Sequence, residues 1–176
     1  MAALSDSSTA SIHALMARLP RAGSVRWIGI RPARAVPMIA LDAVRVDLDG
    51  LDGDRYASCS GKRAVTLIQA EHLPAIAQLS GHAEVAPSLL RRNIVVAGIP
   101  LIALKGRRFR IGEAVLEGTG PCDPCSRMEA ALGPGGYNAM RGHGGLTARV
   151  IEPGWVRLGD SVEALSTPSP QQALPL

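Results

Sequence analysis

Hydrophobic and polar residues alternate over short distances along most of the chain from Ser24 onward. Gly, Pro and Asp separate apolar runs of strand length that read VRWIGI, AVRVDL, RAVTLI, NIVV, LIAL, RFRI, AVLEG and LTARVI. Alternation with a period of two is typical of half-buried antiparallel strands. The closing segment, RVIEPGWVRLGDSVEAL, predicts two strands joined by a Glu-Pro-Gly turn, followed by a turn at Gly159-Asp160.

Apolar residues at helical spacing predict helices elsewhere. In residues 8–20, Ile12, Leu15, Met16 and Leu19 fall on one face, which indicates an amphipathic helix. Residues 69–81, 86–92 and 126–133 predict shorter helices, and Gly81 and Gly133 are suited to end two of them. Many short strands with few long helices indicate a mostly β (α+β) fold, a β-barrel with short peripheral helices.

The chain length fits a single domain. At 176 residues it is long enough to bury a core. We expect an N-terminal helix and lead-in over 1–23, the domain over 24–164 and a flexible Pro- and Ser-rich tail over 165–176. No apolar run is long enough to span a membrane, so a membrane partner is not expected. The N-terminus lacks the features of a secretory signal. Three cysteines then indicate free thiols in a cytoplasmic protein.

The net charge is +4, and all but two of the 19 basic residues are arginine. Arginine suits phosphate and carboxylate ligands. A GC-rich coding bias that places arginine at solvent-exposed positions explains the excess more simply. The basic residues are scattered and the chain has only five aromatic residues for base stacking. A nucleic-acid partner is therefore not expected.

Two of the cysteines lie close together in GPCDPCSRMEAAL, residues 120–132. Cys125 falls where the following helix should begin, so unpaired backbone N–H groups and the helix dipole favour its thiolate form. Arg127 adds a positive charge nearby. The segment predicts a reactive Cys125 with Cys122 as its neighbour.

Three chemistries fit this pair of thiols. A zinc site would use Cys122, Cys125, Cys59 and one histidine. A dithiol would use C-x-P-C at a helix start, as in thioredoxin-like proteins, and a single thiolate could bind a soft metal or carry sulfur. The glycine-rich stretch GPGGYNAMRGHGG follows, and it could offer N–H groups to an anion with His143 near the cysteines, or form a flexible loop.

Three segments together resemble a known family. They read LDGDRYASCSGKRAVTLIQAEHL, LLRRNIVVAGIPLIALKGRRFRIGEAVLEGTGPCDPCSRME and GGLTARVIEPGWVRLGDSV, in this order. They are similar to stand-alone MOSC domains, relatives of the C-terminal domain of molybdenum cofactor sulfurase. The resemblance implies a β-barrel with a signature cysteine, preceded by Pro and followed two places later by a basic residue. These positions correspond to Pro124, Cys125 and Arg127.

The resemblance also implies a function. It suggests binding of a molybdenum–pterin cofactor, with Cys125 as the metal ligand, and handling of sulfur. Bacterial relatives include proteins that reduce N-hydroxylated base analogues. This chain has no domain with a pyridoxal-phosphate lysine, so we expect it not to desulfurate cysteine by that route. The additional Cys122 leaves a two-thiol mechanism open.

An anionic cofactor would favour a positively charged pocket. We expect Arg55, Arg91 and Arg92 to face it, with Asp54 orienting Arg55. The remaining candidate cofactor-binding residues are Asn93, Arg127 and His143.

Two classes of function follow from these expectations. The first is a molybdenum-dependent reductase or a sulfur-transfer protein, which would meet a sulfur donor or acceptor protein or a small-molecule substrate. Cys125 and Cys122 would be its catalytic residues. The alternative is a non-enzymatic zinc-binding or protein-interaction module that uses the CDPC pair.

Overall fold

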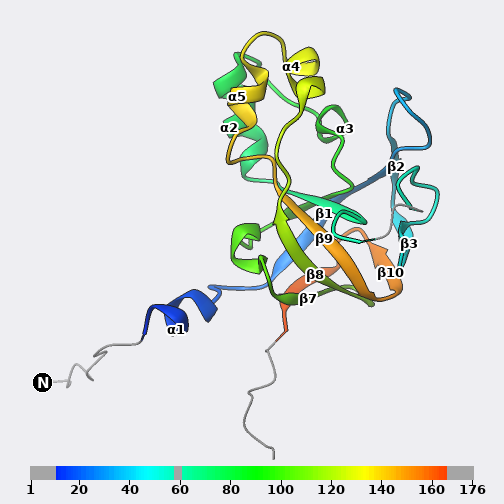
Figure 1. Ribbon diagram of the computed structural model, residues 1–176, viewed down its shortest axis with the longest axis vertical. Coiled ribbons are helices and arrows are strands. Elements are labelled where there is room, and N and C mark those ends of the chain that lie inside the picture. Colours follow the sequence, from blue (N-terminus) through cyan, green and yellow to red (C-terminus); the bar gives the residue numbers. More distant parts are fainter. Residues whose placement is uncertain (1–10, 58–60, 166–176) are drawn as a thin grey trace, which may run out of the picture.

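The centre of the molecule is a closed β-barrel, seen in a computed structural model that describes residues 11–57 and 61–165 (Figure 1). Within these residues seven strands close the ring in the order β1-β11-β7-β8-β9-β5-β6, because β11 pairs with both β7 and β1. Closure removes the exposed strand edges of an open sheet. The strands are β1 (Gly23–Ile30), β5 (Val65–Gln69), β6 (Ile94–Ala97), β7 (Arg108–Ile111), β8 (Ala114–Pro121), β9 (Leu146–Glu152) and β11 (Ser161–Ala164).

The remaining strands lie outside this ring. β2 (Ile39–Leu41) pairs with the end of β1. A separate antiparallel sheet consists of β3 (Ala43–Asp47), β4 (Gly50–Leu51) and β10 (Gly154–Arg157).

Strands β5 and β6 separate two apolar cores. Leu67 and Ile94 are partners across this parallel pair, and both belong to the barrel core with Phe109. Their neighbours Ile68 and Val95 point the other way and belong to a second core beneath the helices. The period of two along a strand therefore fixes the barrel interior on one face and the helical layer on the other.

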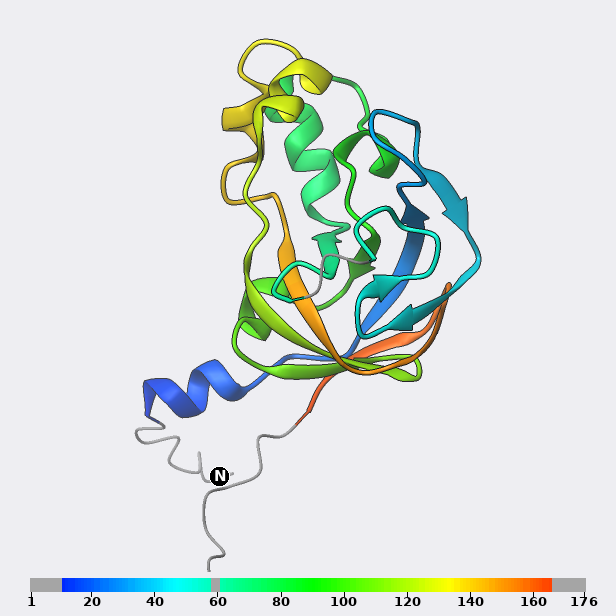
Figure 2. The same ribbon diagram turned by 45° about the vertical axis from the view of Figure 1, so that its right-hand side comes forward.

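Short helices gather at one end of the barrel (Figures 1 and 2). They are α2 (His72–Ser80), α3 (Pro87–Leu90), α4 (Ser126–Leu132) and α5 (Gly136–Met140). α2 ends at Gly81, whose φ of 75° is a left-handed conformation that glycine adopts without strain. The helices α2 and α3 form the crossover that the parallel strands β5 and β6 need. α1 (Ile12–Ala17) lies at the opposite end of the molecule.

The predicted mostly β barrel with short peripheral helices is confirmed, but LIAL is not a strand. These residues form a 3-10 helix, η1 (Leu101–Leu104). Leu101 and Leu104 are buried while Ile102 is 67% exposed, so burial repeats every three residues. That period belongs to a 3-10 helix, in which residues three apart share a face.

Three further differences concern smaller pieces. The pair β5–β6 is parallel where antiparallel strands were predicted. The glycine-rich stretch contains the helix α5, which the sequence did not predict. The predicted amphipathic helix forms as α1, but its apolar face is exposed, and Leu19, which follows the helix, packs against the barrel core.

No helix of the described part is long and apolar enough to cross a membrane. Cys59 and the predicted tail after residue 165 lie outside the described residues.

Candidate functional site

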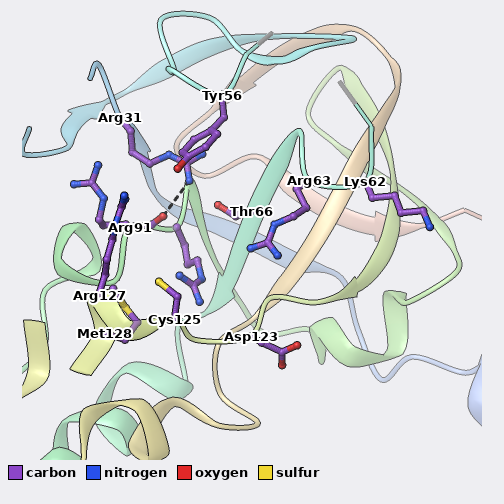
Figure 3. Close-up of a pocket in the computed structure, with 11 residues that line it drawn as sticks. Arg31, Tyr56, Lys62, Arg63, Thr66, Arg91, Asp123, Cys125, Arg127 and Met128 are labelled. Atoms are coloured by element: carbon purple, nitrogen blue, oxygen red, sulfur yellow. Dashed lines mark hydrogen bonds between the residues drawn. The ribbon is translucent and has the colours of Figure 1, made fainter. Parts of the chain in front are cut away.

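A cavity of about 610 Å³ opens where the barrel meets the helical layer. Its wall is strongly basic, and Asp123 is the one acidic residue among those that line it in the described part of the chain. Tyr56, Thr66, Cys125 and Met128 complete the wall (Figure 3). The basic residues that line it are Arg31, Lys62, Arg63, Arg91, Arg92 and Arg127.

Cys125 is the exposed thiol of this cavity. Its backbone is extended, with φ of −127° and ψ of 174°, and it is the N-cap residue of α4. The Cys125 carbonyl accepts a hydrogen bond from the Met128 N–H at 2.8 Å. The prediction that Cys125 begins this helix is confirmed, and Arg127 lines the same cavity.

Cys122 is placed differently, although it lies three residues away. It is buried, it is not among the residues that line the cavity, and both cysteines are free thiols. The Cys122 N–H donates to the Gly145 carbonyl at 2.9 Å, and Arg63 Nη2 lies 3.8 Å from the Cys122 Sγ. Within residues 11–57 and 61–165, no group of three His, Cys, Asp or Glu side chains could hold a metal ion.

A buried network under the cavity is centred on Asp54. The Asp54 carboxylate accepts from Arg31 Nε at 2.9 Å, from Arg31 Nη2 at 3.1 Å and from Asn93 Nδ2 at 2.8 Å. Burial by itself would raise the pKa of Asp54, but the hydrogen bonds from Arg31 and from the Tyr56 N–H lower it below the usual value. The expectation that Asp54 orients Arg55 is therefore wrong, because its partner is Arg31.

Asn93 belongs to this network instead of the cavity wall. It is fully buried, and its Oδ1 accepts from Arg31 Nη2 and from Thr66 Oγ1, each at 2.8 Å. Its Nδ2 donates to Asp54 and to the Gly29 carbonyl. The side-chain amide is thus fully used by β1, β5 and the residues after β4, which places Asn93 as a support for the wall.

Arg91 reaches the cavity from the end of α3. Its φ of 56° is uncommon for a residue with a side chain, and its Nη1 donates to the Val36 carbonyl at 2.9 Å. In Figure 3 a dashed line joins the Arg91 main-chain oxygen to Arg31 Nη1, a contact of 3.4 Å. Burial, and then the nearby charges of Arg31 and Arg127, lower the pKa of Arg91. Positive charges are therefore crowded at this side of the cavity.

Arg92 lines the cavity but is buried, and its guanidinium donates hydrogen bonds to three main-chain carbonyls. Nε donates to Gly144 O at 2.8 Å, Nη1 to Leu90 O at 2.9 Å and Nη2 to Cys122 O at 3.0 Å. Burial lowers the pKa of Arg92. Through the Cys122 carbonyl, the Arg92 guanidinium is held against the segment that carries both thiols.

Two further predicted residues, Arg55 and His143, are not among those that line the cavity. Arg55 lies over the Tyr56 ring at 4.6 Å from its centroid, and Arg31 lies at 4.5 Å from the same centroid. His143 packs edge-on against His72, with ring centroids 4.9 Å apart. Burial, and then the charge of His143, lower the pKa of His72.

Sequence reasoning missed Arg31, Tyr56, Lys62, Arg63 and Thr66. Arg31 follows the buried end of β1, and an arginine directly after a buried strand was the available signal. Lys62 and Arg63 precede β5 as a basic pair next to Gly61. Their position beside Cys125 depends on the barrel bringing β1, β5 and α4 together, which no local pattern reveals.

Solved structures with the same fold support this architecture. YuaD from Bacillus subtilis is 21% identical, with a TM-score of 0.74 and coverage of 82% of this chain and 96% of its own. YiiM from Escherichia coli is 24% identical, with a TM-score of 0.66 and coverage of 85% of this chain and 72% of its own. No curated protein sequence matches the chain. The profile of the MOSC domain matches residues 52–163, which include Cys125 and most of the cavity wall, and the chain therefore belongs to the MOSC domain family.

Proposed function

We propose that the cavity binds an anionic molybdenum–pterin cofactor and that Cys125 provides the thiolate ligand for the metal. One observation carries the proposal: the exposed Cys125 thiol and six basic residues line the same cavity. The MOSC family is associated with this cofactor, and the residues of this chain fit it in size, charge and ligand chemistry.

The fit rests on three properties of the cavity. Its volume of about 610 Å³ lies in the usual range for small-molecule sites. Lys62, Arg63 and Arg127 are exposed basic residues that can bind anionic groups through charge-assisted hydrogen bonds. Cys125 offers sulfur, a soft ligand suited to a metal bound through thiolate.

The bound cofactor would supply redox chemistry, which is the reason to propose reduction of N-hydroxylated compounds. The chain itself would hold the cofactor through its basic residues and present Cys125 to the metal. The buried Arg31–Asp54 pair would keep this part of the wall in place, because its side chains are 8% and 2% exposed and hydrogen-bonded to each other.

Sulfur transfer is a second candidate function, and the exposure of Cys125 favours it. An exposed thiolate can attack the outer sulfur of a donor protein's persulfide, which breaks the donor S–S bond, releases the donor thiolate and leaves a persulfide on Cys125. An acceptor thiolate can then take that outer sulfur in the same way and release the Cys125 thiolate. Cys122 is buried, so only one thiol of the pair meets such a partner directly.

Elemental analysis of the purified chain tests the proposal. The protein would be produced in a host that makes molybdenum cofactor, and molybdenum, zinc and acid-released fluorescent pterin would be measured per chain. We expect molybdenum and pterin together in near-equal amounts. Zinc at one ion per chain without pterin would overturn the proposal and favour the metal-binding module. Persulfide on Cys125 without molybdenum or pterin would overturn cofactor binding and favour sulfur transfer.

A further inference from the structure

His72 and His143 form a pair in the helical layer, and neither residue is among those that line the cavity. His72 is the first residue of α2, and His143 lies in the loop 141–145 that joins α5 to β9. The two imidazole rings pack edge-on, with centroids 4.9 Å apart and an angle of 78° between their planes. In the described structure the Nδ1 atom of each ring is buried and has no hydrogen-bond partner.

This pair is suited to neutral imidazoles. A protonated imidazole carries two N–H donors, and a buried Nδ1–H group without an acceptor is costly. Burial, and then the charge of His143, lower the pKa of His72, whereas the His143 main chain and Glu71 act in the opposite direction. The positive end of α2 also disfavours a cation at its first residue. Protonation therefore places a charge where the fold does not accommodate it.

The charged groups around the pair do not offer it a free carboxylate in the described part of the chain. The Glu71 Oε1 accepts from a main-chain N–H after β6 at 2.7 Å. On β5 and α5, which pack against α2, Tyr137 is the one titratable side chain, and Arg141 at the end of α5 is a cation. Glu129 on α4 accepts from two main-chain N–H groups at the start of α5, each at 2.8 Å.

The loop 141–145 connects the pair to the wall of the cavity. The Gly144 carbonyl accepts from Arg92 Nε at 2.8 Å. The Gly145 carbonyl accepts from the Cys122 N–H at 2.9 Å. If His143 moves away from α2, these two hydrogen bonds are the first contacts that the loop must give up.

We propose that the contact between His72 and His143 is a pH-sensitive latch, which holds the loop 141–145 against α2 at neutral pH and releases it in acid. When one ring takes up a proton at Nδ1, it must turn toward solvent, and the two rings separate. The hydrogen bonds at Gly144 and Gly145 then weaken, so the cavity wall loosens as the pH falls. The latch is a property of the chain itself and needs no cofactor.

The direction of the effect follows from the lowered pKa of His72. A ring freed from the contact regains the ordinary histidine pKa of about 6.5, so the open loop binds the proton more readily than the closed one. The stabilisation of the closed loop is therefore complete above about pH 6.5. It is lost as the pH falls through the lower pKa of the closed state, and uptake of one proton raises the opening constant by at most about tenfold per pH unit.

Hydrogen exchange in the full-length protein tests the latch. NMR would measure exchange of the His143 N–H, which donates to Met140 O at 2.9 Å, and of the Cys122 N–H, at pH 7.5 and pH 5.5. Division by the intrinsic exchange rates gives the opening constants, and we expect both to rise about fivefold over this range. The Gly106 N–H, which donates to the Gly118 carbonyl of the barrel at 2.7 Å, is the internal control and should show no comparable rise.

Two variants identify the group that titrates. His72→Phe keeps an aromatic ring but cannot take up a proton, so the opening constants should lose their dependence on pH. His82→Gln is the matched control, because His82 follows α2 and its Nε2 lies 2.9 Å from the Leu132 carbonyl. This variant should keep the wild-type dependence.

Three results would overturn the latch. They are opening constants that do not rise in acid in the wild type, an equal rise at Gly106, and an equal rise in His72→Phe. The two wild-type comparisons decide the question even if His72→Phe does not fold. Because none of these measurements needs molybdenum, failure of the latch is distinguishable from failure of cofactor binding.

Discussion

Two buried arginines stand in the cavity wall, and each is 7% exposed, yet their surroundings differ. Arg31 is paired with the Asp54 carboxylate, so the charge of the pair is neutral. Arg92 is bonded to three neutral carbonyls and keeps its positive charge. Equal burial therefore serves two purposes: the Arg31–Asp54 pair stabilises the wall, and Arg92 ties together the main chains at Leu90, Cys122 and Gly144.

The largest effect on stability is expected from breaking the Arg31–Asp54 pair. Asp54→Asn leaves the Arg31 charge buried without a counter-ion, and breaking a buried ion pair in this way costs about 3–5 kcal/mol. Urea denaturation followed by circular dichroism would measure the free energy of unfolding.

Asp47→Asn is the matched control for this change. Asp47 pairs with Arg45 at 3.2 Å, but both side chains are about half exposed, at 56% and 44%. An exposed pair of this kind is worth less than about 1 kcal/mol. If Asp54→Asn lowers the free energy of unfolding no more than Asp47→Asn does, the stabilising role of the Arg31–Asp54 pair is contradicted.

A smaller loss in the free energy of unfolding is expected from Gly144→Ala, which acts on the region around Arg92. The new Cβ would lie 2.1 Å from Cys122 O, a main-chain atom, so the main chain around Cys122 must shift. Overpacking of this kind costs about 1–3 kcal/mol, and the Cys125 alkylation rate should fall as well. Gly142→Ala in the same loop is the control: its Cβ meets nothing within 4 Å, so its cost comes from the φ of +79° alone. Equal alkylation rates in these two variants would show that the close approach at Gly144 does not position the thiol.

The pH dependence of stability gives the smallest of these effects and again separates the two regions. The pKa of Asp54 is lowered in the folded protein, so the unfolded chain binds its proton more readily. The stabilisation is therefore complete above the ordinary carboxyl pKa and is lost as pH falls below about 4. Denaturation between pH 5 and pH 2.5 should show this decline in the wild type. An equally steep decline in Asp54→Asn would contradict the assignment to Asp54.

The sequence predicted the barrel and the start of α4 because both depend on local pattern. Alternating residues mark strands such as β1 and β7, and the Pro124–Cys125 pair before a run of helix formers marks the helix start. The partner of Asp54 was not predictable in this way. Arg55 is adjacent in the sequence, but Arg31, 23 positions earlier, occupies the carboxylate because β1 ends beside it. The composition of the glycine-rich stretch predicted an anion-binding or flexible loop. In the structure its Gly144 instead packs closely against the Cys122 main chain.

The two cysteines provide the most direct test of the central claim, that Cys125 in this basic cavity holds the cofactor. Cys125→Ser and Cys122→Ser would be purified from the same cofactor-producing host, and molybdenum and pterin would be measured per folded chain. We predict that Cys125→Ser abolishes molybdenum retention and that Cys122→Ser weakens it only in part, because Cys125 is exposed to the cavity and Cys122 is buried behind it. Full molybdenum retention in Cys125→Ser, or equal loss in both variants, would contradict the account.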